Sequence, residues 1–484
     1  MVNEMKKDFL YKNYIDGKWV FGENDKFIDI HSPIDNSLVG RITSMNKDEV
    51  DSAIKVAKEA QRDWKDVPNH EKANYFYKIA ELLDEQAEDI AEVLIKEIGK
   101  DKKSSVSEIK RTADIIRYTA DIGKSYNEEF IDGDSFPGYT KKKMGIIKRE
   151  PLGVILAISP FNYPINLAAS KIFPALMAGN TVVLKPATQG AISALHLIKV
   201  MDEANIPKGV INTVTGRGSE IGDYVVTHPG IDMINFTGST NTGQRISKIS
   251  SGVPLLMELG GKDPAIVLQD ADLKLAAKQI VDGAFSYSGQ RCTAIKRVLV
   301  EEQVADELIS LLKSEISKLK IGNPLEEEVV VGPLVDEKSA NYVEGLIKDT
   351  IEKGGKLILG GNRKDNLIYP TLFDNVTVDM RLAWEEPFGP VLPVIRVKDA
   401  NEAIEISNES KYGLQAAVFT NDINKAMKIS GKLDVGTVQI NNKTERGPDN
   451  FPFLGVKSSG IGVQGIKSSI EAMSRPKVIA INIR

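Results

Sequence analysis

Residues 153–159 read GVILAIS, an apolar run between a glycine and a serine. Similar runs recur at 181–184 (TVVL), 210–214 (VINTV) and 233–236 (MINF), and residues with helical spacing separate them. Strands that are apolar throughout and alternate with helices are typical of a parallel sheet covered by helices on both faces. This stretch therefore predicts an α/β fold.

Helical periodicity extends to both sides of these strands. It covers residues 46–66, 69–98 and 104–122 upstream, and residues 165–178 and 190–204 between the strands. These segments supply the helices that a parallel sheet needs on its two faces.

A second α/β block is predicted from about residue 264 to 445. We expect its helices at 304–319, 338–353 and 400–409, and strands near residues 296 and 414. The last segment, 477–483 (KVIAINI), reads as a strand with no turn after it. Such a strand often pairs outside its own domain, including across a subunit interface.

The bulk composition excludes several classes of function. The chain has 484 residues, of which 42% are hydrophobic and 27% charged, so we expect two or three globular domains. The net charge of -5 provides no basic excess for a nucleic-acid or acidic-membrane partner. We expect no membrane span, because apolar runs of the required length are missing from the sequence. One cysteine and no recognisable export signal favour the cytoplasm.

The single cysteine, Cys292, lies in residues 285–294 (FSYSGQRCTA), a small and polar context that is unusual for a core cysteine. Upstream, Glu258 lies in residues 257–262 (MELGGK), between an apolar stretch and a glycine pair. A nucleophilic thiol and a separate carboxylate suit covalent catalysis followed by hydrolysis. An inert buried thiol remains the alternative from these residues alone.

Two features predict a dinucleotide site. Residues 238–243 (GSTNTG) follow a predicted strand and open a predicted helix, where glycines let backbone N–H groups approach a pyrophosphate. The spacing is not G-x-G-x-x-G, so a simple turn is the alternative. Lys185 and Thr188 follow an earlier strand, at the sheet edge where open α/β sheets bind ligands. A lysine and a threonine with no neighbouring acid favour NADP over NAD, because an acid there would repel a 2′-phosphate.

Five motifs together resemble the aldehyde dehydrogenase superfamily and follow its order over most of the chain. They are SPFNYP at 159–164, FTGST at 236–240, MELGGK at 257–262, GQRC at 289–292 and EEPFGP at 385–390. The resemblance implies a Rossmann-type parallel-sheet cofactor domain, a second α/β catalytic domain and a small β oligomerisation extension.

The same resemblance implies domain boundaries and an assembly. The NADP-binding domain would comprise residues 1–122 and 146–257, and the catalytic domain residues 258–455. Residues 123–145 and 456–484 would be bridging segments that join the subunits of a homotetramer.

Within the family, the chain looks closest to the NADP-dependent, non-phosphorylating dehydrogenases of glyceraldehyde 3-phosphate. The distinguishing stretches are VSEIKRTA at 106–113, FSYSGQRC at 285–292 and NNKTERGP at 441–448. The resemblance implies irreversible oxidation of D-glyceraldehyde 3-phosphate to 3-phosphoglycerate with NADP and water.

The resemblance also implies the catalytic roles. Cys292 would attack the aldehyde as a thiolate, and we expect its surroundings to lower its pKa. Asn162 would donate to the oxyanion, together with the backbone N–H of Cys292. Glu258 would activate the water that hydrolyses the thioester. Outside a family motif, Asn162 would read as a turn residue and Glu258 as a surface acid.

Binding residues follow from the same motifs. Residues expected to contact the cofactor are Ser159, Lys185, Thr188, Asp223, Gly238, Ser239, Gly243, Leu259, Glu386 and Phe388. Residues expected to contact the phosphorylated substrate are Arg111, Asn162, Tyr163, Arg291, Thr293 and Arg446. Guanidinium forks suit phosphate, although each arginine taken singly reads more readily as a surface ion-pair residue.

Other functions remain to be separated from this one. A dehydrogenase of another acidic aldehyde, such as succinate semialdehyde, would use Arg111 and Arg446 to bind a carboxylate. A phosphorylating dehydrogenase would need a histidine beside its cysteine, and an acyl transfer to coenzyme A would not need Glu258. A catalytically silent relative is the alternative outside the enzymes. No spacing of His, Cys and Asp predicts a metal site.

Overall fold

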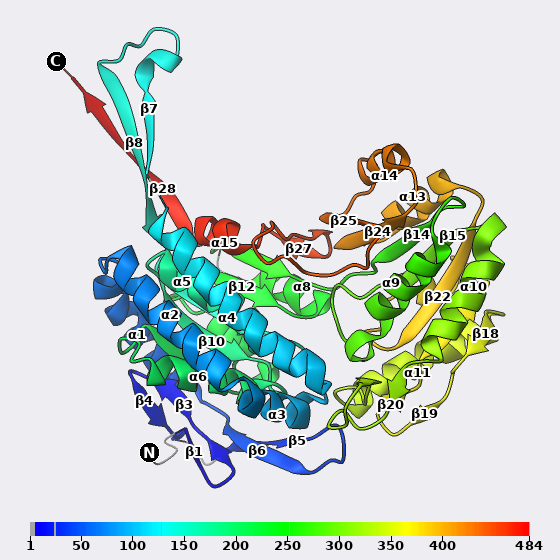
Figure 1. The fold of residues 1–484 in the computed structure, drawn as a ribbon. Coiled ribbons are helices and arrows are strands. Elements are labelled where there is room, and N and C mark those ends of the chain that lie inside the picture. Colours follow the sequence, from blue (N-terminus) through cyan, green and yellow to red (C-terminus); the bar gives the residue numbers. More distant parts are fainter. Residues whose placement is uncertain (1–4, 24–25, 127, 251, 484) are drawn as a thin grey trace.

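The computed structural model describes residues 5–23, 26–126, 128–250 and 252–483. Two large α/β sheets form its body, and a narrow three-stranded sheet projects from it (Figure 1). The predicted fold class, two parallel-sheet α/β units with a small β extension, is confirmed.

The first large sheet has six strands in the order β11-β10-β9-β12-β13-β27. They are β9 (Val154–Ser159), β10 (Thr181–Pro186), β11 (Ile211–Thr213), β12 (Met233–Thr237), β13 (Leu255–Glu258) and β27 (Gly460–Ile461). All neighbours are parallel except β13 and β27. The strand order reverses between β9 and β12, and open α/β sheets bind ligands at such a switch point, outside the carboxyl ends of the strands.

Helices cover both faces of this sheet, as the all-apolar strands predict. Along β9, Val154 and Leu156 pack on one face, and Ile155 and Ala157 pack on the other. The first face is covered by α1 (Lys47–Trp64), α7 (Asp223–Val226) and α8 (Thr240–Ile249). The second is covered by α2 (Asn69–Glu85), α4 (Lys102–Lys124), α5 (Asn166–Met177) and α6 (Ala191–Glu203).

The structure breaks one segment of predicted helical periodicity into two helices. Residues 69–98 form two helices, α2 and α3 (Ala87–Ile98), and Gln86 separates them with φ -98° and ψ 11°. Leu83 and Ile90 on either side are buried in the same core. Apolar spacing reports which residues are buried, and it does not register a short break in the helical backbone.

The second large sheet has seven strands in the order β18-β21-β22-β15-β14-β24-β25. They are β14 (Pro264–Val267), β15 (Arg297–Glu301), β18 (Lys356–Leu359), β21 (Thr371–Asp374), β22 (Val391–Val397), β24 (Gln415–Phe419) and β25 (Thr437–Ile440). Helices α9 (Leu273–Phe285) and α10 (Glu302–Ile316) pack on one face. Helices α11 (Glu337–Glu352), α13 (Ala400–Glu409) and α14 (Ile423–Ser430) pack on the other. The predicted second α/β block and its elements are therefore confirmed.

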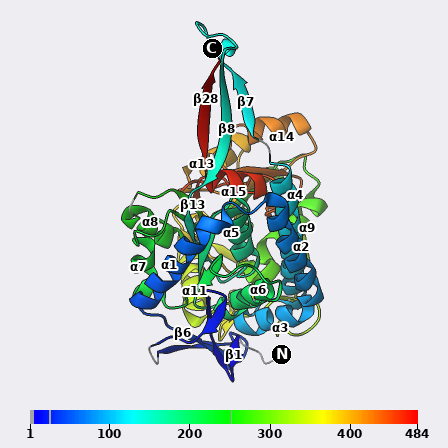
Figure 2. The same ribbon diagram turned by 90° about the vertical axis from the view of Figure 1, so that its left-hand side faces the viewer.

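The projecting sheet consists of β7 (Glu129–Asp132), β8 (Lys143–Pro151) and β28 (Ser474–Asn482), in the order β28-β8-β7. Figures 1 and 2 show it standing clear of the body, with the C-terminus at its tip. The predicted terminal strand is confirmed, and it pairs along its length with β8 of the same chain. Pairing across a subunit interface stays a prediction.

Of the helices formed by the described residues, none is both long and apolar enough to cross a membrane.

Candidate active site

A cavity of about 450 Å³ opens at the carboxyl ends of β9, β10 and β12, beside the switch point of the six-stranded sheet. Residues from the second α/β unit close its other side. The site residues predicted from the sequence that line it are Ser159, Asn162, Lys185, Thr188, Gly238, Ser239, Leu259, Cys292, Glu386 and Phe388. The structure thus gathers the nucleophile and most of the predicted cofactor residues in one place.

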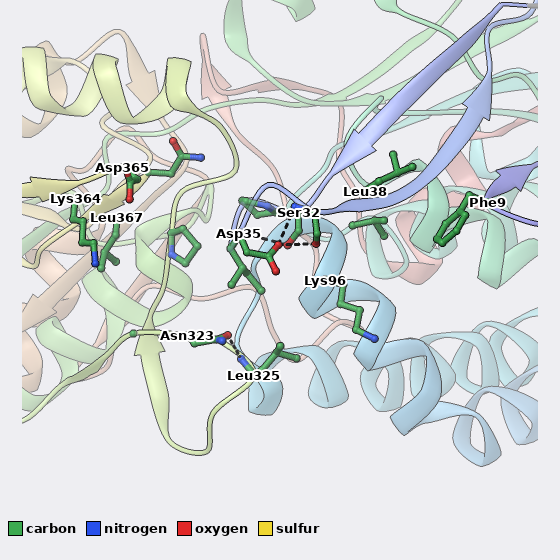
Figure 3. Close-up of a pocket in the computed structure, with 17 residues that line it drawn as sticks. Phe9, Ser32, Asp35, Leu38, Lys96, Asn323, Leu325, Lys364, Asp365 and Leu367 are labelled. Carbon is green, nitrogen blue, oxygen red and sulfur yellow. Dashed lines mark hydrogen bonds between the residues drawn. The ribbon is translucent and has the colours of Figure 1, made fainter.

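A larger hollow of about 630 Å³ lies between Lys96 of α3, residues 32–37 and the start of β6 (Leu38–Thr43) on one side and loops of the second unit on the other (Figure 3). Asp35 and Asn323, which Figure 3 labels, hydrogen-bond to backbone N–H groups two residues further along the chain. Among the described residues that line this hollow there is no cysteine, no histidine and no predicted site residue. It is therefore not the candidate active site.

Cys292 follows a single 3-10 turn, η3 (Ser286–Gly289), which directly succeeds α9. Tyr287 and Ser288 in this turn have φ of 50° and 54°, a left-handed conformation that costs a residue other than glycine roughly 1–3 kcal/mol. The hydroxyl of Ser288 exchanges two 2.9 Å hydrogen bonds with the backbone of Gly332. These bonds hold the strained turn that carries the cysteine into the cavity.

The thiol of Cys292 has a carboxylate as its neighbour. It donates to Glu258 Oε1 at 3.4 Å. Burial, and next the charge of Glu258, raise the pKa of the Cys292 thiol well above its ordinary range, although Lys296 and Arg446 act in the opposite direction. The expected lowering of this pKa is therefore wrong for the protein alone, because burial disfavours the thiolate more than the two cations favour it.

Asn162 is held in place from two sides. Its Nδ2 donates to the carbonyl of Gln290 at 2.8 Å, and its own carbonyl accepts from Lys100 Nζ at 3.1 Å. Lys100 is fully buried and forms a 2.5 Å ion pair with Glu108, whose other oxygen accepts the N–H of Ile165 at 3.0 Å. The amide of Asn162 carries a second N–H, which a substrate oxyanion can use.

Glu258 ends β13, and its side chain is only 2% exposed. Its Oε2 accepts from Arg446 Nη1 at 2.6 Å and from Thr237 Oγ1 at 3.5 Å. Lys171 of α5 donates to Thr237 Oγ1 at 2.6 Å, and burial lowers the pKa of Lys171 to about 7. The carboxylate thus faces the thiol with one oxygen and a guanidinium with the other.

Arg111 and Arg446 meet at one acid, although they are far apart in sequence. Arg111 donates to the two carboxylate oxygens of Asp449 at 2.5 and 2.8 Å, and also to the backbone carbonyl of Arg446. Arg446 Nε lies 3.6 Å from Asp449 Oδ1. Tyr163 lies near Arg111 and contributes to its electrostatic surroundings. The structure therefore brings together three of the residues predicted to bind substrate.

Arg291 and Thr293 flank the nucleophile in sequence, and the recorded contacts of both are with the protein itself. Arg291 Nη2 donates to the carbonyl of Gly283 at 2.5 Å, and its buried Nε has no partner. In the described part of the chain, the contacts of Arg291 do not join it to Arg111 or Arg446. Thr293 is buried, and its carbonyl accepts from Thr444 Oγ1 at 2.8 Å. Substrate binding by Arg291 and Thr293 stays a prediction.

The adenosine side of the cavity fits a phosphorylated cofactor. The buried hydroxyl of Ser159 has no hydrogen-bond partner. Lys185 Nζ donates only to backbone carbonyls, including that of Gly216 at 3.2 Å, and burial lowers its pKa to about 8. A buried ammonium that no carboxylate of the described residues neutralises suits a phosphate group. Thr188 lines the same cavity beside it.

Helix α8 begins at the cavity. Ser239 is its N-cap residue and accepts a backbone N–H of the first turn, and α8 directs its remaining N–H groups at the cavity. A Cβ at Gly243 would lie 2.4 Å from the side chain of Leu259, so this glycine allows α8 to pack closely on the chain after β13. Asp223 does not line the cavity and forms an exposed ion pair with Arg245 of α8.

Glu386 and Phe388 close the cavity from the second unit. Glu386 Oε1 lies 2.9 Å from Lys296 Nζ. A Cβ at Gly260 would lie 2.1 Å from Glu386 Oε2, so only glycine leaves room for the carboxylate. The ring of Phe388 packs edge-on against Phe161 at 5.9 Å between centres.

Several residues that contact the predicted site were not found from the sequence. They are Lys100, Lys171, Lys296, Asp449 and Gln464. Lys171 carried a signal, because it is the one charged residue within the otherwise apolar α5 segment. Lys296 contacts the carbonyl of Cys292 four residues earlier, whereas the cited partners of Lys100, Asp449 and Gln464 lie further away along the chain, where the sequence gives no signal of the contact.

Comparison with known protein families agrees with the geometry. The family model described as the Aldehyde dehydrogenase family matches residues 19–479. The NADP-dependent glyceraldehyde-3-phosphate dehydrogenase of Streptococcus equinus is 55% identical over 473 residues, which span 98% of this chain and 99% of that protein. The enzyme of the same name from Pisum sativum is 50% identical over 476 residues, which span 98% of this chain and 96% of the relative.

A solved structure is equally similar. The crystal structure of NADP-dependent glyceraldehyde-3-phosphate dehydrogenase from Bacillus halodurans C-125, complexed with NADP, superposes with a TM-score of 0.97. It is 55% identical in sequence, and the match covers 99% of this chain and 100% of that one.

Proposed function

The chain belongs to the aldehyde dehydrogenase family, and we propose that it oxidises D-glyceraldehyde 3-phosphate to 3-phosphoglycerate with NADP and water. The observation that carries the proposal is the placement of Arg111 and Arg446 around Asp449, next to the buried pair of Cys292 and Glu258. Two guanidinium groups beside a nucleophile suit a small aldehyde that carries a phosphate.

The cofactor is NADP, which accepts a hydride from the substrate when it is bound. Lys185 and Thr188 would hold the 2′-phosphate, and the unpartnered hydroxyl of Ser159 would bind close to them. Glu386 would bind the nicotinamide ribose, with Phe388 beside the ring. Similar proteins that carry NADP in their names support this assignment.

The first chemical step joins the aldehyde to Cys292. Burial raises the pKa of the thiol, so Glu258 accepts its proton as the sulfur attacks, and the 3.4 Å hydrogen bond leads directly from Sγ to Glu258. The amide of Asn162 and the backbone N–H of Cys292 then donate to the oxyanion. A donor of this kind contributes about 3 kcal/mol to the transition state.

The second step hydrolyses the thioester. Once Glu258 has released the thiol proton to solvent, it takes a proton from water, the water oxygen bonds to the acyl carbon, and the bond to Cys292 sulfur breaks as the sulfur receives a proton. Release by water makes the oxidation irreversible and requires neither inorganic phosphate nor a histidine. Of the four histidines, His31, His70, His196 and His228, none lines the cavity among the described residues.

The substrate phosphate would bind to Arg111 and Arg446, with Tyr163 adding a hydroxyl. Arg291 would contribute only if its side chain left the carbonyl of Gly283. A carboxylate in place of the phosphate defines the alternative, a dehydrogenase of succinate semialdehyde or a similar acidic aldehyde. The names of the relatives from Streptococcus equinus and Pisum sativum favour the phosphorylated substrate.

We further propose that the chain acts in the cytoplasm as a homotetramer. Residues 123–145 and 456–484 contribute to the projecting sheet, and several of their large apolar side chains are exposed. They would bridge the subunits, while residues 1–122 with 146–257 and residues 258–455 would form the cofactor and catalytic domains.

A matrix of substrates and cofactors tests the function. NADPH or NADH formation is followed with D-glyceraldehyde 3-phosphate, D-glyceraldehyde and succinate semialdehyde, with and without inorganic phosphate. We expect the highest kcat/KM for D-glyceraldehyde 3-phosphate with NADP, independent of added phosphate. A higher kcat/KM for the semialdehyde, a requirement for phosphate, or inactivity with every aldehyde would each contradict the proposal.

A further inference from the structure

All three nitrogens of the Arg446 guanidinium already face protein acceptors. Nη1 donates to Glu258 Oε2 at 2.6 Å, Nη2 donates to Gln464 Oε1 at 3.0 Å, and Nε lies 3.6 Å from Asp449 Oδ1. Its Cζ lies 4.9 Å from the ring centre of Phe453, and the side chain is 13% exposed. The guanidinium has five N–H groups, and one on each nitrogen faces a protein acceptor, so a phosphate that takes both Nη atoms with the planar fork competes with these partners.

One of these partners, Glu258, is the proposed catalytic base. The carboxylate of Glu258 is nearly inaccessible to solvent, and its contact with Arg446 at 2.6 Å is much shorter than its contacts with Thr237 and Cys292 at 3.5 and 3.4 Å. A carboxylate in a charge-assisted hydrogen bond is fixed in orientation, because the guanidinium occupies a lone pair of one of its oxygens. Glu258 held by Arg446 is thus fixed with Oε1 on the thiol, an orientation that suits proton transfer from Cys292 and not from water.

We propose that Arg446 is a positioning residue that restrains Glu258 until the phosphate of the substrate takes the guanidinium. This inference rests on the proposed function, because it requires a phosphorylated aldehyde. A phosphate carries more charge than a carboxylate and offers three acceptor oxygens to the same planar fork, so it competes well for Arg446. Arg111, held by Asp449 on the other side, keeps a second guanidinium next to the phosphate.

The exchange acts on the hydrolysis step. The phosphate stays attached to the acyl group, so Arg446 remains on it while the thioester exists, and Glu258 is free to take a proton from water. The water oxygen bonds to the acyl carbon, the carbon–sulfur bond breaks, and the proton on Glu258 passes to Cys292 sulfur. When the product leaves, Arg446 pairs with Glu258 again. The substrate phosphate thereby contributes to selectivity in hydrolysis of the thioester as well as in binding.

Aldehydes without a phosphate should show the restraint directly. D-glyceraldehyde can acylate Cys292, but Arg446 then stays on Glu258 throughout. We expect its thioester to hydrolyse roughly ten- to a hundredfold more slowly than that of D-glyceraldehyde 3-phosphate. Rapid mixing with NADP should show a burst of NADPH followed by slow turnover, and the burst amplitude counts the reactive thiols in each preparation.

The decisive variant is Arg446→Met, measured with D-glyceraldehyde. If Arg446 restrains the base, the variant keeps the burst and its thioester hydrolyses roughly tenfold faster than in the wild type. With D-glyceraldehyde 3-phosphate the same variant shows a raised KM, because a phosphate ligand is lost. Arg446→Lys, which retains a cation that can pair with Glu258, should hydrolyse the D-glyceraldehyde thioester as slowly as the wild type.

Two further arginines provide matched controls. Arg111→Met should raise KM for D-glyceraldehyde 3-phosphate without accelerating hydrolysis of the D-glyceraldehyde thioester, since no hydrogen bond of the described residues joins Arg111 to Glu258. Arg117→Met, which removes an arginine paired with Asp84 on the outside of α4, should resemble the wild type in every step.

Two outcomes would overturn the inference. One is hydrolysis of the D-glyceraldehyde thioester in Arg446→Met that is equal to or slower than in the wild type. The other is the absence of a burst with D-glyceraldehyde in the wild type, which would show that hydrolysis is not the slow step. The proposed function is tested separately. A wild-type kcat/KM that is higher for succinate semialdehyde than for D-glyceraldehyde 3-phosphate would contradict it.

Discussion

Glu258 and Cys292 share one nearly dry space, so each determines what the other can do with a proton. The carboxylate raises the pKa of the thiol and is also the nearest group that can accept the thiol's proton. In hydrolysis the same carboxylate has to act on water. Proton transfer from the thiol and activation of water belong to different steps, so a substitution of Glu258 can affect them differently.

We expect Glu258→Ala to lower steady-state turnover by about a hundred- to ten-thousandfold, because a general base contributes that much to the rate. A burst of NADPH should remain, since removal of the Glu258 charge lowers the pKa of Cys292 and partly offsets the loss of its proton acceptor. Glu302→Ala, on the exposed start of α10, is the control and should leave both phases unchanged. Wild-type turnover in Glu258→Ala would refute the assigned role.

Lys171 should make stability depend on pH. Burial lowers its pKa from 10.5 to about 7 in the folded protein, so the unfolded chain binds one more proton between these values. The native state therefore gains stability as pH rises through this window, and Lys171→Met removes that gain. We expect the stability advantage of Lys171→Met over the wild type to shrink by up to about 3 kcal/mol between pH ~7 and ~9.

Thermal unfolding of both proteins at the two pH values measures this change. Lys278→Met, an exposed lysine on α9, serves as the control, and its difference from the wild type should not depend on pH. A pH-independent difference for Lys171→Met would show that Lys171 is not held neutral in the fold.

Gly260 leaves room for the carboxylate of Glu386 in the cofactor site because it has no side chain. In Gly260→Ala, the new methyl group would lie 2.1 Å from Glu386 Oε2, which would have to leave its place beside Lys296. We expect KM for NADP to rise roughly ten- to a hundredfold, as small displacements of positioning groups do. Gly345→Ala on α11 meets no atom within 4 Å and should keep KM while stabilising the helix by up to about 1 kcal/mol. An unchanged KM in Gly260→Ala would contradict a role for Glu386 in binding.

At the scale of elements, the projecting sheet exposes apolar side chains on both of its faces, including Val478 and Ile131 on one of them. On the other face, the registers place Ile146 between Ile479 and Phe130, and Ile481 beside Met144. The side chains of Phe130, Ile479 and Ile481 are exposed in the single chain. Exposed apolar side chains on a long edge strand are typical of a surface that pairs with another subunit.

We expect the double variant Ile479→Asp/Ile481→Asp to lower the mass of the assembly, as measured by light scattering after size-exclusion chromatography. Two carboxylates cannot enter an apolar interface without losing hydration. Lys477→Ser on the same strand is the control and should retain the wild-type mass. A monomeric wild type would refute the proposed tetramer, and a variant with the wild-type mass would place the interface elsewhere.

At the scale of the whole molecule, the active site lies between the two large α/β units. Ser159 and Lys185 come from the six-stranded sheet, whereas Cys292 and Phe388 come from segments of the second unit. A cofactor in this cavity contacts both units at once. Ligand binding should therefore stabilise the molecule as a whole and not one unit alone.

We expect NADP at about a hundred times its Kd to stabilise the protein by about 2.7 kcal/mol, visible as a rise in Tm. The same concentration of NAD should give a smaller rise, because Lys185 has no 2′-phosphate to bind. In Lys185→Met the two cofactors should give equal shifts, while Lys278→Met keeps the wild-type difference. A difference that survives in Lys185→Met would assign cofactor selection to another residue.

Much of this architecture could be predicted because its signals are local. The all-apolar strands at 153–159 and 233–236 and the helices between them follow from side-chain periodicity, which is the same in the sequence and in the fold. The break at Gln86 between α2 and α3 was missed, since buried residues continue on both sides of it. Motif spacing pointed to the cavity residues Cys292 and Asn162, but it carried no information on what surrounds them.

The sequence by itself determined the α/β class, the order of the elements, and the candidate nucleophile, base and cofactor residues. Only the tertiary structure decided that burial and Glu258 raise the pKa of the Cys292 thiol, that Arg111 and Arg446 meet at Asp449, and that Arg446 hydrogen-bonds to Glu258. Periodicity and motifs depend on neighbours along the chain. Burial and charge depend on distances in space, and Glu258 and Arg446, 188 positions apart, become neighbours only when the two α/β units pack together.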